Sequence, residues 1–229
     1  MRLRPFLTIA VPLACAALFV RLGVWQLARL DQKRAFNAVL LERLASPPAD
    51  VGSLPGDTAL GHYRRVSASG TMLYDREVAY AGRSHEGSPG VDLLTPMKIA
   101  GRDTVVIVNR GWAYSFDAAT IDHARWKEKD PSHVAGYAET FAGKERGNAQ
   151  PAQHRVHALD RAAIEAMVGL PVAPYVVVQT SDSAHADSIP VRLEIPAPDE
   201  GPHKSYAIQW FSFALVAVVG GVALSRRSR

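Results

Sequence analysis

Two apolar runs at the ends of the chain limit its possible folds more than any other feature. The first runs uncharged from Phe6 to Val20, and the second holds nineteen uncharged residues from Tyr206 to Leu224. A helix rises about 1.5 Å per residue, so a hydrocarbon core of about 30 Å needs about 20 apolar residues. The second run is therefore long enough to cross a bilayer. The first becomes long enough when it extends past Arg21 to Ala28, because an arginine near the end of a span can reach the headgroups.

A cleavable signal peptide is the alternative interpretation of the first run. Met1 to Arg4 would form its basic start, ahead of an apolar stretch. The apolar stretch continues through Trp25, however, and no small-x-small cleavage site precedes a polar segment. Cys15 follows Pro12, Leu13 and Ala14, which fits a lipoprotein site poorly. We therefore predict an anchor that is not cleaved.

Two spans place both termini on one side of a membrane and the middle of the chain on the other. We predict transmembrane helices at 6–28 and 206–224, cytoplasmic tails at 1–5 and 225–229, and a periplasmic domain at 29–205 of a bacterial inner-membrane protein. Lys and Arg near the helix ends decide the orientation only narrowly. Five lie on the side of the termini, namely Arg2, Arg4, Arg226, Arg227 and Arg229. Four lie on the side of the loop, namely Arg29, Lys33, Arg34 and Lys204. The prediction depends more on the ease with which a long loop is exported.

The middle of the chain reads as a β-rich domain. Six short runs rich in Val, Ile, Tyr and Thr lie between turn residues, at 64–70, 77–83, 90–99, 103–111, 133–141 and 175–181. Helical spacing of apolar residues predicts a membrane-proximal helix near 31–45, and Asp160 can cap a second helix that Gly169 and Pro171 end. The predicted fold class is therefore an α+β membrane protein, in which two transmembrane helices flank a mainly antiparallel barrel or sandwich with one or two helices.

Catalytic and metal-binding motifs are lacking in the sequence. The single cysteine, Cys15, lies in the first span, so the middle domain has no disulfide and no thiolate pair. His154 and His157 have a spacing that could hold a metal on a helix, but they precede the cap Asp160 and are expected in a loop. The net charge of +4 comes largely from arginines near the membrane, so anionic lipid explains it without nucleic acid. We predict a protein that is not an enzyme and has no catalytic residues.

The motif NRGWAY, residues 109–114, follows a run typical of a buried strand. Two interpretations of it remain open. In one, Trp112 closes the core at the strand end and Arg110 pairs with a carboxylate. In the other, Arg110, Gly111 and Trp112 form a contact surface for a partner, because Trp and Arg are frequent at interface hot spots.

The inner ends of the two spans lie in the same leaflet, whichever way the protein is inserted. Arg21, Trp25 and Arg29 share one face of the first helix, and a comparable stripe on the second contains His203, Tyr206, Ala207, Trp210 and Ala214. An aromatic belt at the headgroup level accounts for the Tyr and Trp residues. It accounts less well for a histidine at this place, which could bind the iron of a haem.

Three stretches together resemble the surfeit locus protein one family, the membrane factors that assist assembly of cytochrome c oxidase. They are LGVWQLARLDQK, VNRGWAY and HKSYAIQWFSFA, and their order and spacing match from end to end. The resemblance implies a membrane hairpin with a large outer domain. In some bacterial members it also implies binding of haem a and its delivery toward the catalytic subunit of the oxidase. The family's second-span histidine matches His203, and Lys204 stands where members often have leucine, which makes its surroundings more polar.

We therefore expect an inner-membrane assembly factor for cytochrome c oxidase. The expected partners are its catalytic subunit, haem a synthase and membrane lipid. His203 is the predicted iron ligand, and the rest of the predicted haem a site is Tyr206, Trp210, Trp25 and Arg29. The predicted partner-binding residues are Arg110, Gly111 and Trp112. The first alternative is a scaffold that docks oxidase subunits without haem. The second, a membrane-tethered periplasmic hydrolase, would need a clustered nucleophile and base that the sequence does not offer.

Overall fold

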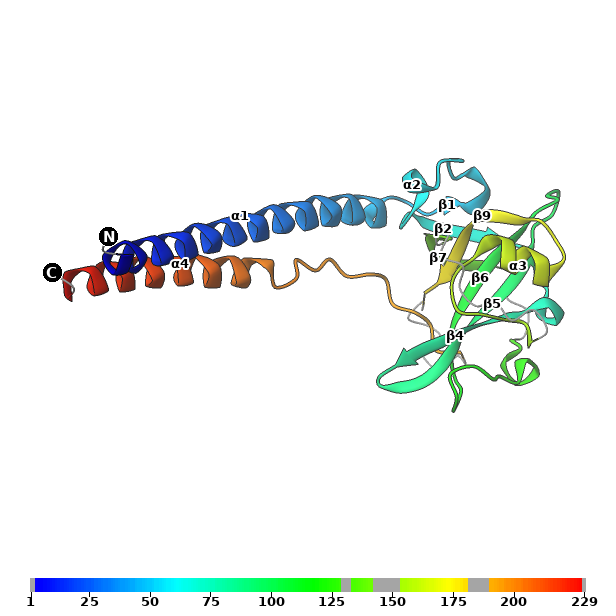
Figure 1. Ribbon diagram of the computed structural model, residues 1–229. Helices are drawn as coiled ribbons and strands as arrows, with labels where there is room; N and C mark the ends of the chain where they lie inside the picture. The colour runs from blue at the N-terminus through cyan, green and yellow to red at the C-terminus, as the bar shows by residue number, and fades with distance from the viewer. Residues whose placement is uncertain (1–2, 129–132, 142–152, 181–189, 228–229) are drawn as a thin grey trace. The chain divides into compact units, whose positions relative to one another are not determined.

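The computed structural model describes residues 3–128, 133–141, 153–180 and 190–227, which form two compact units (Figure 1). The helical unit comprises Met1–Leu41 and Ala197–Arg229, and the β-rich unit comprises Glu42–Pro196. The outermost residues of the two predicted tails and the last residue of the predicted strand at 175–181 lie outside the described residues. Two apolar helices at the ends of the chain therefore flank a β-rich unit with few helices, as predicted.

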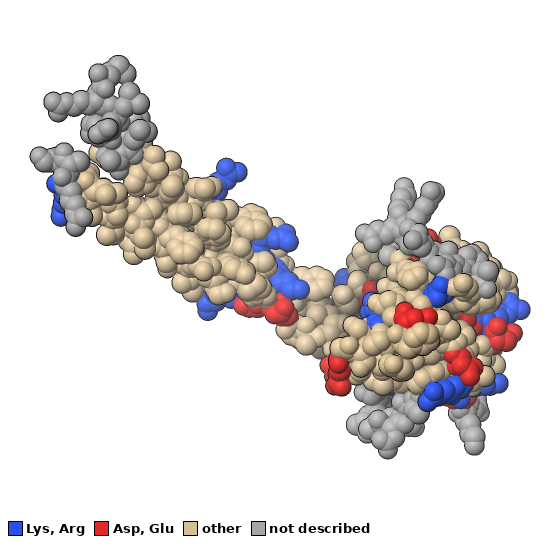
Figure 2. All heavy atoms as spheres, turned by 60° about the horizontal axis from the view of Figure 1, so that its bottom comes forward, with Lys and Arg blue, Asp and Glu red and all other residues tan. Residues whose placement is uncertain are grey.

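The helical unit consists of α1, Leu3–Ala45, and α4, His203–Arg227. The helix predicted near 31–45 is the uninterrupted continuation of α1. Both helices are long and apolar enough to cross a membrane. Figure 2 shows a band of uncharged surface along them. Their outward-facing apolar side chains include Val11, Leu18, Val20 and Val24 on α1 and Ile208, Leu215, Val216 and Val219 on α4.

Small residues allow α1 and α4 to pack closely. A Cβ added to Gly23 would stand 2.7 Å from Cε1 of Phe211, and one added to Gly221 would stand 2.8 Å from Cβ of Pro12. Ala207 and Ala214 are buried on the same face of α4. Close approach of backbones through small side chains is a common means of helix association in membranes.

The β-rich unit is built on one nine-stranded sheet with the strand order β1-β2-β7-β9-β6-β5-β4-β8, and β3 pairs separately with β5. In chain order its elements are β1 (Ala49–Asp50), η1 (Val51–Ser53), α2 (Thr58–Gly61), β2 (Arg65–Ser69), β3 (Thr71–Met72), η2 (Tyr74–Arg76), β4 (Val78–His85), β5 (Ser88–Lys98), β6 (Val105–Tyr114), η3 (His123–Trp126), β7 (His133–Thr140), β8 (Arg155–Val156), α3 (Arg161–Val168) and β9 (Val172–Gln179). All six predicted strand segments correspond to strands of this sheet.

The sheet is mixed: most of its strand pairs are antiparallel, as predicted, and the parallel pairs were not predicted. Five strand pairs are antiparallel, but β1/β2, β4/β8 and β6/β9 are parallel. Parallel neighbours need a crossover connection, and the chain between β6 and β9 supplies one that includes α3. The α3 helix begins and ends as predicted. Asp160 Oδ1 accepts a hydrogen bond from the Ala163 amide, and Gly169 ends the helix with φ of 70°.

Both faces of the sheet are covered by core residues. One cluster contains Val66, Met97, Val108 and Val177, and the other contains Val78, Ile107, Ile164 and Val176. Adjacent residues of β6 and β9 therefore point into opposite clusters, because side chains alternate along a strand. Burial on both faces makes β6 a rigid support for the NRGWAY motif at its end.

Candidate functional site

His203, the predicted iron ligand, is the first residue of α4 and is half-buried. Its Nδ1 lies 2.8 Å from Oε1 of Gln26, a residue of α1 that is only 9% exposed. An amide oxygen can only accept a hydrogen bond, so Nδ1 of His203 is the donor. In a neutral imidazole the other nitrogen, Nε2, then carries the lone pair.

The surroundings of Nε2 leave room for a ligand. Among the described residues, the ring of His203 makes its hydrogen bond through Nδ1, and Nε2 has no hydrogen-bond partner. Gly201 lies beside the ring with φ of 65°, and a Cβ at this position would stand 3.6 Å from Nε2. The missing side chain thus keeps the edge of the imidazole open. An unprotonated and accessible imidazole nitrogen is what a haem iron takes as an axial ligand, so the residues fit the group.

The segment before His203 is fixed to α1 by polar contacts. Arg34 forms two hydrogen bonds with the carboxylate of Glu200, at 2.7 and 3.2 Å, and Nδ2 of Asn37 donates to the backbone oxygen of Asp199 at 3.0 Å. The hydrogen bond from Arg34, helped by its charge, lowers the pKa of Glu200. An exposed pair of this kind contributes little to stability, because solvent screens the charges. We therefore regard these contacts as positioning the segment more than as stabilising the unit.

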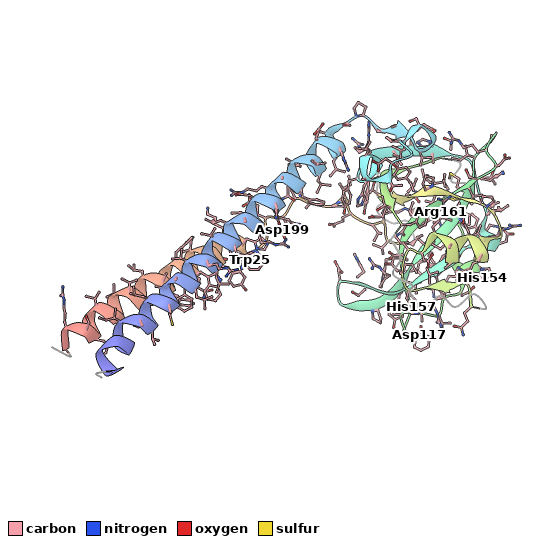
Figure 3. All side chains as sticks on the ribbon, turned by 45° about the horizontal axis from the view of Figure 1, so that its top comes forward. Trp25, Asp117, His154, His157, Arg161 and Asp199 are labelled. Carbon is pink, nitrogen blue, oxygen red and sulfur yellow. The ribbon has the colours of Figure 1, made fainter. Side chains whose placement is uncertain are left out.

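The other predicted haem-site residues differ in how far their side chains are exposed. Trp210 is half-buried against aromatic neighbours, stacked on Phe19 at 5.7 Å between ring centroids and edge-on to Phe213 at 5.8 Å. Trp25, labelled on α1 in Figure 3, is 54% exposed, and Tyr206 is also exposed. The guanidinium of Arg29 donates to Oε1 of Gln32 at 2.9 Å. The structure thus brings His203 and Trp210 to the contact face of the helices, and leaves Trp25 and Tyr206 facing outward.

The residues that hold His203 in place were not predicted from the sequence; they are Gln26, Gly201 and the residues that fix the preceding segment to α1. One signal could have identified Gln26. It is an amide in a mainly apolar span, and a buried polar group in such a span needs a partner. The contacts of Asp199 and Glu200 gave no such signal, because they lie in an irregular segment without periodicity.

Arg110 is completely buried at the centre of a polar network in the β-rich unit. Its guanidinium donates to Glu77 Oε2 at 2.5 and 3.2 Å, to Thr95 Oγ1 at 2.7 Å and to Glu128 Oε1 at 2.6 Å. A β-bulge explains this inward position. The β5/β6 register shifts at Arg110 and Gly111, where the ladder passes from the pair Leu94/Asn109 to the pair Asp92/Trp112. Bulges redirect side chains in this way.

Gly111 and Trp112 bind the chain segment around Val191. The amide of Trp112 donates to the oxygen of Val191, and the amide of Val191 donates to the oxygen of Trp112, both at 2.8 Å. Gly111 has φ of 119°, and a Cβ there would stand 2.2 Å from the Val191 oxygen. Arg192 reinforces the contact through the Arg110 oxygen at 2.5 Å and through Glu128. The motif therefore adopts the packed arrangement with a paired arginine, and partner contact at Arg110, Gly111 and Trp112 stays a prediction.

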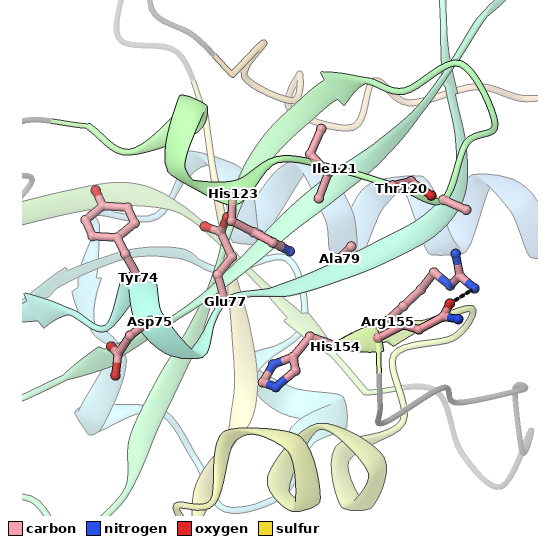
Figure 4. Close-up of a pocket in the computed structure, with 11 residues that line it drawn as sticks. Tyr74, Asp75, Glu77, Ala79, Thr120, Ile121, His123, His154 and Arg155 are labelled. Atoms are coloured by element: carbon pink, nitrogen blue, oxygen red, sulfur yellow. Dashed lines mark hydrogen bonds and ion pairs between the residues drawn. The ribbon is translucent and has the colours of Figure 1, made fainter.

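Glu77 connects the Arg110 network to a cleft of about 690 Å³ (Figure 4). Burial of Glu77 opposes its ionisation, but hydrogen bonds from His123 and Thr95 and the charge of Arg110 outweigh burial and lower the pKa of Glu77. His154 also lines the cleft; it and His157 lie outside helices, as predicted. Within the described ranges, no group of three or more His, Cys, Asp or Glu side chains could hold a metal ion.

Comparison with known proteins finds one family over most of the chain. The model of the SURF1 family matches residues 13–215. A SURF1-like protein of Rickettsia bellii is 28% identical over 210 residues, which cover 88% of this chain and 84% of that protein. A SURF1-like protein of Monosiga brevicollis is 25% identical over 219 residues, which cover 90% and 83% of the two chains. A SURF1-like protein of Mycobacterium tuberculosis is 26% identical, with coverage of 88% and 76%.

Proposed function

This chain belongs to the SURF1 family, a family of oxidase assembly factors, and we propose that it holds haem a for delivery to the catalytic subunit of cytochrome c oxidase. The proposal that the protein binds haem is supported by the contacts of the two ring nitrogens of His203. Gln26 occupies its Nδ1, and Nε2 is left open beside the bare backbone of Gly201. The proposed activity is binding and transfer of the cofactor, with haem a synthase as the proposed donor and no catalytic turnover.

We propose that α1 and α4 cross a bacterial inner membrane as a hairpin. The length and apolar composition of both helices support this, as do their outward-facing Val, Leu and Ile side chains, which would be unfavourable in water. Arg226 near one end and Trp25 and Tyr206 near the other fit the usual positions of basic and aromatic anchors. Of the two possible orientations of the hairpin, we propose the one in which both termini are cytoplasmic and the β-rich unit is periplasmic.

Different residues of the helical unit would bind different parts of the cofactor. Haem a, when bound, supplies an iron that takes an imidazole nitrogen as an axial ligand. His203 would offer Nε2 for this purpose. Tyr206, Trp210 and Trp25 offer apolar ring surfaces to a porphyrin.

Arg29 is the proposed partner of the haem carboxylates. It lies three residues after Gln26 and therefore about one helical turn from the level of His203. Its guanidinium donates to a neutral amide, that of Gln32, so its charge is not neutralised by this contact. Charge-assisted hydrogen bonds to carboxylates are among the stronger polar contacts in proteins.

An absorption spectrum tests the haem assignment. We would purify the full-length protein in detergent from cells that make haem a, and compare wild type with His203→Ala and with the matched control His157→Ala. We expect the wild type and the control to carry a haem Soret band, and His203→Ala to lose it or shift it. If His203→Ala retained the same amount of haem and the same band, the ligand assignment would be wrong. A wild type that supports oxidase assembly without haem would favour the haem-independent scaffold.

A further inference from the structure

We propose that Gln26 is a positioning residue that selects the Nδ1–H tautomer of His203 and aims its Nε2 away from α1. The hydrogen bond of 2.8 Å between Oε1 of Gln26 and Nδ1 of His203 joins residues that are 177 positions apart in the chain. The selection of the tautomer follows from this contact alone. Its consequence for haem rests on the function proposed above.

The packing of the two helices holds Gln26 in place. Gly23 lies one turn before Gln26 and contacts the Phe211 ring, and Leu30 lies one turn after it and is 4% exposed. On the other helix Ala207, 2% exposed, follows His203 by one turn. Small residues at Gly23 and Ala207 bring the backbones close enough for an amide to reach an imidazole across the interface. The contact is therefore built into the helix pairing.

Because Gln26 is buried, Gln26 and His203 depend on each other as hydrogen-bond partners. A polar amide without a hydrogen-bond partner in an apolar environment is unfavourable. Among the described residues, His203 is the side-chain partner of Gln26. Loss of the histidine would leave the amide oxygen unpaired, and loss of the amide would leave the imidazole free to rotate and to exchange tautomers.

The neutral charge of Gln26 has a further consequence for ligand release. A histidine ligand is often oriented by a carboxylate, which makes the imidazole a stronger donor to the metal. Gln26 gives the same orientation without that added basicity. We therefore infer that the site orients His203 firmly but binds iron less tightly than a carboxylate-supported histidine would, which suits a cofactor that must be passed on.

The tautomer can be measured without haem. We would prepare full-length protein in lipid nanodiscs with 15N-labelled histidine, and assign His203 from the spectrum of His203→Ala. In wild type we expect Nδ1 to be protonated and Nε2 to be unprotonated. Gln26→Leu removes the acceptor and should abolish this preference, whereas Gln26→Glu retains an acceptor and should preserve it. Gln209→Leu is the matched control, because Gln209 is an exposed amide on α4. An unchanged tautomer in Gln26→Leu would overturn the proposal.

Haem binding to the same variants tests the second consequence. With ferric haem as the probe, we expect Gln26→Leu to bind about 10- to 100-fold more weakly than wild type, the usual effect of removing the partner of a histidine ligand. Gln26→Glu should bind more tightly and release haem more slowly to an acceptor such as apomyoglobin. Gln209→Leu should behave as wild type.

The two measurements separate this inference from the proposed function. If the tautomer responds to Gln26 as expected but His203→Ala binds haem like wild type, the positioning role of Gln26 stands and the haem function of His203 is wrong. If His203→Ala loses haem and Gln26→Leu does not weaken it, His203 is the ligand and the role of Gln26 toward haem is wrong. Unchanged chromatographic and circular dichroism behaviour of Gln26→Leu would show that the variant is folded.

Discussion

Substitution of Gly111 by alanine should release the segment around Val191 from β6. The backbone of Gly111 has φ of 119°, which an L residue adopts at a cost of about 1–3 kcal/mol. The added Cβ would stand 2.2 Å from the Val191 oxygen, which is too close to be tolerated without movement. The movement would break the two hydrogen bonds between Trp112 and Val191, each of which contributes about 1 kcal/mol. We therefore expect a total loss of about 3–5 kcal/mol, taking the sum of these effects.

Hydrogen exchange and thermal unfolding of the full-length protein would measure this effect. Gly111→Ala should increase amide exchange at Trp112 and Val191 and lower the Tm of the β-rich unit. Gly101→Ala is the matched control, because Gly101 also has a positive φ, 73°, but a Cβ there would meet nothing within 4 Å. The control should lose only the strain contribution. Equal effects of the two substitutions would refute the argument, since the contact with Val191 would then contribute nothing.

Three further predictions concern buried charges of the β-rich unit. Arg110→Met would leave the Glu77 carboxylate buried without its main cation, so we expect a loss of about 3–5 kcal/mol in a chemical unfolding experiment. The pKa of Glu77 is lowered in the folded state, so its contribution to stability is present above its unfolded pKa and is lost as the pH falls through its folded pKa. Glu77→Gln should therefore flatten the acid side of a plot of Tm against pH. Burial raises the pKa of Asp92 despite the nearby Arg83, so folding takes up a proton there and stability falls as the pH rises from the unfolded to the folded pKa. Asp92→Asn should remove this fall and raise the Tm at neutral pH, and a lower Tm would contradict it.

Local signals in the sequence were sufficient for most elements of the fold. Two terminal apolar runs, the first extended past Arg21, are about as long as a bilayer core is thick and predicted α1 and α4, and Asp160 with Gly169 predicted the limits of α3. The six strands were predicted because β-branched and aromatic residues cluster between turn residues. These signals are local, so each could be interpreted without knowing the neighbours of the segment in space.

The pairing of strands could not be predicted in the same way. A strand such as β6, buried on both faces, has the same composition whether its neighbour is parallel or antiparallel, and the parallel pair β6/β9 therefore escaped prediction. The bulge at Arg110 and Gly111 also depends on a partner strand. Without the position of that strand, the sequence could not show whether the side chain of Arg110 is buried or exposed.

The candidate site shows the same division between local and distant information. His203 was identified because a histidine at the end of a span is unusual and because its surroundings resemble a family motif. Gln26 was not identified as its partner, since the pairing depends on the axial register of two helices that are far apart in sequence. The register is set by contacts such as Gly23 with Phe211, which only the structure shows.

The most direct test of the account is the resonance Raman spectrum of the ferrous haem a complex of the full-length protein. The stretching band of an iron–imidazole bond reports a histidine ligand without reference to activity. We predict this band for wild type and for Gln209→Leu, and its absence from His203→Ala. A band that persists unchanged in His203→Ala, or that is missing from a haem-loaded wild type, would contradict the claim that His203 holds the iron.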